Sequence, residues 1–188
     1  MTFRLASVIM VLTLLVLPTT AISGVYINGA VGSTQYEYDD VNNGSAKKAT
    51  IGYRFKPVTE PSFALELSYI NGGEADIDLN GTLFQGNNLF LETTGTNFSL
   101  AYYLQSPNSN LFLYLQAGAY QFETSLENKV NGLNVTESGS GFSWGVGLGF
   151  LFAQHFSVFF DVEGFAGVHD FADDDTVTIM TVGAGYYF

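Results

Sequence analysis

Ionisable side chains are scarce in this sequence, and four of them stand in segments that are otherwise small or apolar: Arg54, Glu66, Asp161 and Glu163. A charge in such surroundings is costly unless an opposite charge pairs with it. One cation among three acids predicts a buried network with Arg54 as its hub, which Lys48 could join. Structural filling of the interior is the favoured interpretation. A gated path for protons or ions is the alternative, and no residue in the sequence favours it.

A second group of residues that could carry chemistry is the oxygen-rich segment that begins at Asp76. Asp76, Asp78 and Asn80, followed by Gly81, have the spacing of a calcium-binding loop. Position 12 of that motif is Asn87 here instead of the bidentate glutamate. The simpler interpretation is an acidic loop that turns at Asn80 and Gly81, a favourable pair for a tight turn. These three residues are the only metal-site candidates, and no cofactor is predicted.

The composition restricts the class of protein. The chain has 188 residues, with 6 Lys and Arg against 18 Asp and Glu, and no cysteine. Charged residues make up 13 % of the chain, against about 25 % in soluble domains. The acidic balance argues against nucleic acid as a partner, and the lack of cysteine excludes disulfides and thiolate metal sites. No segment beyond the amino-terminus is a spanning helix of ~18 apolar residues, so contact with a membrane would need strands.

Residues 1–23 have the features of a secretory signal peptide. Arg4 supplies the positive charge, and the apolar run Leu5–Leu17 is followed by small residues that allow cleavage after Ala21 or Ser23. An uncleaved membrane anchor is the weaker interpretation, because the apolar run is short. Residues 24–188 are then expected to form a single domain.

That domain has a hydrophobic period of two, which places successive side chains on opposite faces of a strand. One face of each predicted strand is apolar, and the opposite face carries glycine, serine and the four charges described above. The apolar faces comprise alternate residues of eight segments: Val25–Val31, Ala49–Phe55, Phe63–Tyr69, Phe98–Leu104, Leu111–Ala119, Phe142–Phe152, Val158–Gly164 and Thr178–Phe188.

The connections between these strands alternate in length. Long polar loops are expected at 35–45, 71–88, 123–138 and 170–175, and short turns at 56–61, 106–109 and 153–155. Eight strands, alternating connections and apolar faces about ten residues long are typical of an outer-membrane barrel. A soluble, lipocalin-like barrel is the alternative. It is disfavoured because the non-apolar face lacks a hydrated, charged exterior and carries its charges at mid-strand.

The carboxy-terminal segment Val182-Gly-Ala-Gly-Tyr-Tyr-Phe188, with the signal peptide and the eight-strand pattern, resembles the small outer-membrane barrels related to OmpA and OmpX. The segment Phe63–Tyr69 is similar to the third strand of those proteins. The resemblance implies that Val182, Ala184, Tyr186 and Phe188 form the signal that the barrel-assembly machinery reads. It also implies contact with outer-membrane lipid and lipopolysaccharide. The acidic cluster at 170–175 is interpreted as a solvated loop, and divalent-cation bridges from it to lipopolysaccharide phosphates are the alternative.

His155 and Ser157 have the order of the His-x-Ser pair in outer-membrane lipid A deacylases. His155 falls in a turn predicted to face the periplasm, the wrong side for lipid A at the cell surface. Because the geometry of the groups decides whether such a pair is catalytic, no enzyme is predicted.

The sequence therefore predicts an all-β, eight-stranded, antiparallel, up-and-down transmembrane β-barrel in the bacterial cell outer membrane, reached by Sec-dependent export and signal peptide removal. Its expected role is structural or interactive: membrane integrity, adhesion, or host or phage contact through four surface loops. A narrow porin-like channel for ions or small solutes is the alternative, and a lipid A-modifying enzyme is a more distant one. A monomer with a surface ligand at its loops is expected, and the sequence does not identify that ligand.

Overall fold

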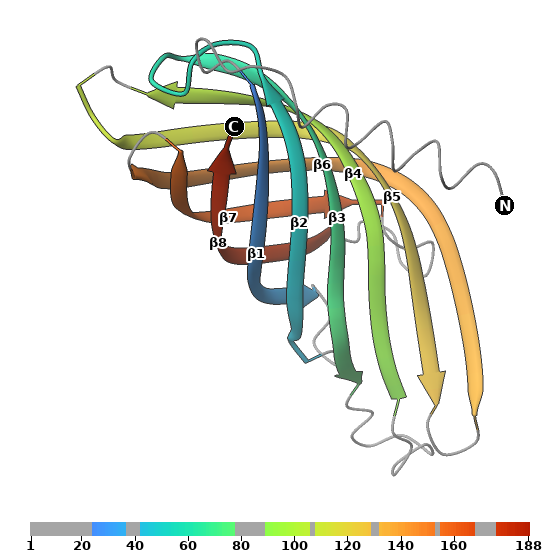
Figure 1. The fold of residues 1–188 in the computed structure, drawn as a ribbon. Coiled ribbons are helices and arrows are strands. Elements are labelled where there is room, and N and C mark those ends of the chain that lie inside the picture. Colours follow the sequence, from blue (N-terminus) through green and yellow to red (C-terminus); the bar gives the residue numbers. More distant parts are fainter. Residues whose placement is uncertain are drawn as a thin grey trace, which may run out of the picture.

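The computed structural model is a closed barrel of eight antiparallel strands, in which each strand pairs with the next and β8 closes onto β1 (Figure 1). This arrangement confirms the predicted fold class. The strands are Val25–Tyr36 (β1), Gly44–Arg54 (β2), Ser62–Ile77 (β3), Leu89–Gln105 (β4), Leu111–Asn128 (β5), Leu133–Phe152 (β6), Phe156–Ala166 (β7) and Thr176–Tyr187 (β8). The structure describes residues 24–36, 42–77, 89–105, 108–128, 132–152, 155–167 and 176–188. Within these ranges, no helix is long and apolar enough to cross a lipid bilayer.

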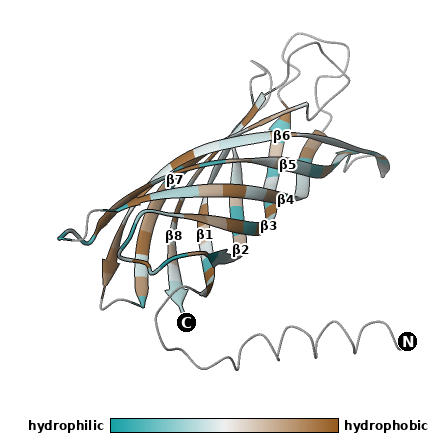
Figure 2. Ribbon diagram, turned by 90° about the horizontal axis from the view of Figure 1, so that it is seen from above, coloured by the Kyte–Doolittle hydropathy of each residue, from teal (hydrophilic) through white to brown (hydrophobic). Residues whose placement is uncertain are grey.

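Side chains alternate between the lumen and the outer surface along every strand, as the period of two requires. Apolar and hydrophilic residues follow one another along the ribbons in Figure 2. The outward positions are those predicted to be apolar, and many of their large side chains are about half exposed, among them Ile27, Ile51, Leu67, Phe98, Leu115, Val146, Phe160 and Val182. The predicted assignment of faces is therefore confirmed for all eight strands.

The lumen is filled by two apolar clusters with a polar layer between them. The cluster at the end of the short turns contains Tyr26, Val58, Tyr103, Phe112, Tyr114, Phe159 and Tyr187. The cluster at the opposite end contains Tyr36, Ile70, Tyr120, Phe122, Phe165, Val177 and Ile179. Along β7, Asp161 and Glu163 stand between Phe159 of the first cluster and Phe165 of the second. An eight-stranded barrel has room for this filling and for little else.

Glycines on the lumen face make room for the aromatic rings of this filling. Tyr26 lies directly across from Gly52 in the β1–β2 ladder, and a Cβ at Gly52 would come within 2.2 Å of the ring. The same arrangement joins Tyr114 to Gly147 in the β5–β6 ladder, where the added Cβ would lie 2.3 Å from the ring. Phe112 and Gly149 in that ladder are a third such pair. The run of alternate glycines in β6 therefore accommodates the rings of β5.

Four strands extend further than the sequence analysis predicted. At the end opposite the carboxy-terminus, β3–β6 run past the ends of β1 and β2 (Figure 1). The predicted loop at 71–88 is strand as far as Ile77, and most of the predicted loop at 123–138 belongs to β5 and β6. The prediction of long loops there was wrong because the outward positions of these extensions are largely polar, whereas apolar residues such as Ala75, Leu91 and Phe122 lie on the inner face. The apolar outer face that identified the other parts of the strands is therefore missing from these extensions.

Candidate functional site

The centre of the lumen holds an ion-pair network whose cation is Lys48. The Lys48 ammonium donates hydrogen bonds to the carboxylates of Asp161 and Glu163, with a distance of 2.5 Å from Nζ to Glu163 Oε1. All three side chains are buried. The Asp161 carboxylate also accepts hydrogen bonds from Tyr114, at 2.8 Å, and from Thr181. Buried charges are tolerated when they are paired and hydrogen-bonded in this way.

Glu66, the third predicted acid, is held by tyrosines instead of by a cation. Its Oε1 accepts hydrogen bonds from the hydroxyl of Tyr26 and from the hydroxyl of Tyr103, the latter at 2.7 Å. Glu66 is 5 % exposed, so these two donors stand in for the water that the carboxylate would otherwise bind.

Arg54 lies at the short-turn end and is not the hub of this network. Its Nη2 donates to the main-chain carbonyl of Glu60 at 2.8 Å, and its guanidinium carbon lies 4.6 Å from the centre of the Tyr103 ring. No ion pair joins Arg54 to an acid among the described residues. The difference from the prediction has a geometric cause: because strands in a barrel are tilted and staggered, Lys48 of β2 is level with the acids of β7, and Arg54 lies beyond them.

The network is enclosed on both sides. Toward the short turns, Val58 of the β2–β3 turn packs into the first apolar cluster and is 2 % exposed. In the second cluster, Ile70, Tyr120 and Phe165, among others, line a cavity of about 10 Å³. Such a space holds about one water. The packing around the ion pairs therefore leaves little free volume for a solute in the described part of the lumen.

The extensions of β3–β6 form a projecting sheet (71–77, 89–96, 121–128 and 133–141) with an acidic outer face. Its carboxylates belong to Glu74, Asp76, Glu92, Glu123 and Glu127. Glu74 lies directly across from Glu92 in the β3–β4 ladder, an arrangement of like charges that disfavours pairing of the two strands.

The projecting sheet also has an open edge. Strand β6 pairs with β5 from Leu133 onward, but its pairing with β7 begins only at Phe142, across from Ala166. Within the described part of the chain, no strand pairs with the free side of 133–141. This edge has one charged residue, Glu137, and no proline, so the usual protection of an edge strand against pairing is slight.

The candidate metal site is only partly described. Asp76 lies on β3, whereas Asp78 and Asn80 lie outside the described residues, as do the acidic cluster at 170–175 and the signal peptide at 1–23. The described ranges contain no group of three or more histidine, cysteine or acidic side chains that could hold a metal ion. The metal site at Asp76, Asp78 and Asn80 stays a prediction.

His155 and Ser157 do not form a catalytic pair in the structure. The Nδ1 of His155 donates to the main-chain carbonyl of Tyr187 at 2.9 Å, and its ring stacks on Tyr186. Ser157 is buried in the lumen wall, and no hydrogen bond between the two side chains occurs in this described segment. The histidine therefore anchors the last strand at the short-turn end.

The last strand presents the residues of the predicted assembly signal on the outer surface. Val182, Ala184 and Tyr186 point outward from β8, and the Tyr186 ring contacts those of Phe156 and Phe188. The main-chain N–H of Phe188 donates to the carbonyl of Val25 at 3.1 Å, which ties the chain end to β1. Recognition of these residues by the assembly machinery stays a prediction.

Sequence reasoning missed the neutral partners of the lumen acids. Tyr26, Tyr103, Tyr114 and Thr181 all stand on the face opposite the apolar one, so the alternation does place them in the lumen. Their pairing with particular carboxylates depends on contacts across the barrel between strands distant in sequence, such as Tyr114 with Asp161.

Comparisons with known proteins agree with this architecture. A family model described as "Outer membrane protein beta-barrel domain" matches residues 5–188. No curated protein sequence matches significantly. Among solved structures, Neisserial surface protein A is similar, with a TM-score of 0.66 and 13 % identity over 90 % of this chain and 100 % of that one.

Two further solved structures are also similar. The amino-terminal barrel domain of Pseudomonas aeruginosa OprF has a TM-score of 0.58 and 15 % identity over 90 % of this chain and 100 % of that one. Yersinia pestis Ail, solved in complex with the heparin analogue sucrose octasulfate, has a TM-score of 0.54 and 16 % identity over 87 % of this chain and 96 % of that one. At such identities the likeness concerns the fold alone.

Proposed function

Because the chain belongs to the family of outer membrane protein β-barrel domains, we propose that it is a cell-surface interaction protein of the bacterial outer membrane and makes its contacts through the projecting sheet. The single observation that carries this proposal is the length of β3–β6. The apolar outward band ends at three cross-strand neighbours, Phe98, Ala119 and Phe142. From Phe142 to Leu133, β6 continues for about 30 Å along its axis, at ~3.4 Å per residue.

The chemistry of the projecting sheet favours a positively charged, extended partner segment. The outer face carries the five carboxylates named above, and, among the residues that the structure describes, the free edge at 133–141 has unpaired main-chain groups available for strand addition. Ail was solved with a polyanion. The projecting sheet of this protein is acidic and has the same sign of charge as a polyanion, so we expect discrimination against polyanions such as heparin.

The filled lumen and the position of His155 support an interaction role over the two alternatives. A porin-like path would have to pass the layer of Lys48, Asp161 and Glu163 and both apolar clusters. A lipid A-modifying enzyme would need a nucleophile with its base beside it, and His155 is engaged with the Tyr187 carbonyl. A structural contribution to the membrane accompanies the interaction role.

The route to the membrane belongs to the same proposal. Residues 1–23 direct Sec-dependent export and are removed, and the barrel-assembly machinery reads Val182, Ala184, Tyr186 and Phe188. The inserted protein is a monomer that contacts lipopolysaccharide in the outer leaflet. A mature amino-terminus at residue 22 or 24, determined by mass spectrometry of protein purified from outer membranes, would support this route.

The test trims the hairpin that projects furthest. Thr124 and Glu137 are cross-strand partners, so replacing 125–136 by Asn-Gly joins them through a favourable two-residue turn. Binding of an unstructured lysine-rich peptide and of heparin would be measured by biolayer interferometry on the barrel in lipid nanodiscs. We expect the wild type to bind the peptide and not heparin, and trimming to weaken peptide binding at least tenfold.

A second variant and a control separate the contribution of the acidic face to peptide binding from that of the free strand edge. Glu92→Gln with Glu123→Gln should weaken peptide binding without altering the edge. Glu60→Gln, at the short-turn end, should leave it unchanged. Unchanged binding in both the trimmed barrel and the double variant would overturn the interaction role, and discrete conductance steps in planar bilayers would favour the channel.

A further inference from the structure

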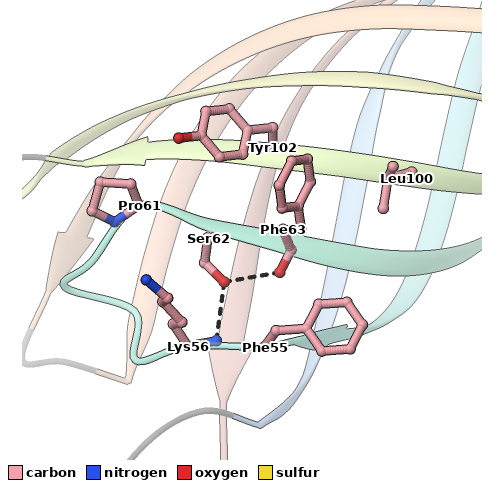
Figure 3. Close-up of a pocket in the computed structure, with 7 residues that line it drawn as sticks. All are labelled: Phe55, Lys56, Pro61, Ser62, Phe63, Leu100 and Tyr102. Carbon is pink, nitrogen blue, oxygen red and sulfur yellow. Dashed lines mark hydrogen bonds between the residues drawn. The ribbon is translucent and has the colours of Figure 1, made fainter.

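A groove on the lipid-facing side of the barrel lies where β2, β3 and β4 approach the short-turn end. It is an open groove lined by Phe55, Lys56, Pro61, Phe63, Leu100 and Tyr102, with a volume of about 590 Å³ (Figure 3). This volume lies within the range of small-molecule sites in proteins, roughly 300–1,000 Å³. A groove of this size on a lipid-facing surface can bind a lipid molecule, whereas a flat surface makes only transient contact with an acyl chain.

The groove has a polar end and an apolar end. In Figure 3, the Lys56 ammonium and the Tyr102 hydroxyl lie on the side next to Pro61, and Leu100 lies on the opposite side, beyond Phe63. Lys56 belongs to the turn between β2 and β3. The groove therefore has the polarity of an amphiphile.

The register of the strands aligns this polarity with the membrane. Tyr102 pairs with Phe63 and Leu100 pairs with Leu65, so Leu100 lies two residues deeper, or about 7 Å along the strand. The polar end thus stands at the membrane surface, where lipid phosphates lie, and the apolar end reaches into the hydrocarbon. An aromatic and cationic rim at this level is typical of the membrane interface.

The polar end is held in place by the chain itself. Ser62 Oγ accepts a hydrogen bond from the Lys56 N–H at 3.0 Å and donates one to the Phe63 carbonyl at 2.9 Å. The same carbonyl accepts the Phe55 N–H at 3.0 Å, and the Phe63 and Tyr102 ring centres are 4.7 Å apart. Walls fixed before a ligand arrives lose less entropy when it binds.

The charged side chains near the groove indicate the class of ligand that it binds. Of the cations that the structure describes, Lys48 and Arg54 are buried in the lumen, and Lys47 stands at the far end of β2. Lys56 is therefore the only exposed cation at this end of the described chain. Glu60 of the same turn does not line the groove. A single cation above an apolar floor fits one phosphate ester with an acyl chain attached.

We propose that this groove is a binding site for one glycerophospholipid of the periplasmic leaflet. The phosphate lies at Lys56 and Tyr102, and one acyl chain runs over Phe63 toward Leu100. With one cation and no lining acid, the site prefers a net-anionic headgroup over a zwitterionic one.

Native mass spectrometry of the mature barrel in detergent tests the site with dioleoyl phosphatidylglycerol and with dioleoylglycerol, which lacks the phosphate. We expect one phosphatidylglycerol to bind about fivefold more tightly than dioleoylglycerol, the ratio that corresponds to one lysine beside a lipid phosphate. Lys56→Gln should abolish this preference. Lys47→Gln, which removes an exposed lysine at the other end, should retain it.

A second variant tests the acyl part of the groove. Leu100→Trp fills the apolar end and should weaken the binding of both lipids, while the heat-modifiable gel shift reports that the barrel remains closed. Equal affinities for the two lipids in the wild type would overturn the proposal. An equal loss in Lys47→Gln and Lys56→Gln, or undiminished binding in Leu100→Trp, would do the same.

Discussion

Replacing Lys48 by methionine removes the only cation of the central lumen network. Lys48 contacts two carboxylates, and Asp161 and Glu163 are 1 % and 2 % exposed. After the change, Asp161 keeps the hydroxyls of Tyr114 and Thr181, but Glu163 keeps only the Gln116 amide. Loss of one partner from a buried ion pair costs about 3–5 kcal/mol. We expect Lys48→Met to reduce the free energy of unfolding by that amount.

The assay is urea unfolding in phospholipid vesicles, followed by tryptophan fluorescence. Trp144 is the only tryptophan of the chain, points outward from β6 and is 47 % exposed, so its emission reports contact with lipid. Lys47→Met is the matched control, because Lys47 is the neighbouring lysine on the outer face. A surface change of this kind stays within about 0.5 kcal/mol.

A second substitution sharpens the test. Glu163→Gln in the Lys48→Met background removes the least compensated charge and should recover at least half of the lost stability. The reasoning would be refuted if Lys48→Met cost less than about 1 kcal/mol, the level of an exposed ion pair, or if Glu163→Gln made the double variant less stable still.

Three further outcomes follow from the same structure. Arg54→Met should change the free energy of unfolding by only about 1–2 kcal/mol in the same assay, because it removes one hydrogen bond to a carbonyl and also two buried nitrogens, Nε and Nη1, that have no hydrogen-bond partner in the described structure; a cost above 3 kcal/mol would restore Arg54 as a hub. Val146→Arg, in the middle of the apolar band, should cost about 2–4 kcal/mol and Val146→Thr much less, and equal unfolding curves would contradict the lipid-facing assignment. A lumen-facing change such as Gly147→Ser would be a poor control for Val146→Arg, since its Cβ would meet the Tyr114 ring at 2.3 Å. Deletion of Phe188 should sharply lower the yield in the outer membrane of cells while the purified variant still refolds in detergent, because one rim aromatic contributes only ~2 kcal/mol; a normal yield would contradict the assembly-signal role.

The alternation of side chains made most of the barrel wall predictable. Within the apolar band each outward residue is apolar, so the faces of segments such as Phe142–Phe152 followed directly from the sequence. Beyond Ala119, β5 continues outward with Gln121, Glu123, Ser125 and Glu127. At this end of the barrel the outer face is largely polar, and apolar residues such as Leu91 and Phe122 face the inside. The pattern of an apolar outer face therefore stops there, and the projecting sheet was predicted as loop.

The sequence alone did not show which of the two cations of β2 pairs with the lumen acids. Arg54 and Lys48 occupy the same face of β2, so the sequence pattern cannot distinguish them. Their heights relative to Asp161 depend on strand tilt and on the stagger accumulated around the barrel. The tyrosine donors to Glu66 were hidden for the same reason, because Tyr26 and Tyr103 lie on distant strands.

The pairs of a ring with a glycine also bear on how the strands align while the barrel forms. The lumen-facing neighbours of Gly52 on β2 are Thr50 and Arg54, so a slide of β1 by two residues would drive the Tyr26 ring into a side chain. On β6, Gly145 and Gly149 flank Gly147, and Tyr114 would meet a glycine after a two-residue slide in either direction. The first hairpin thus accepts one alignment, whereas the alignment of β5 with β6 depends on their short connection. Lengthening that connection should produce misaligned barrels at this seam before any other.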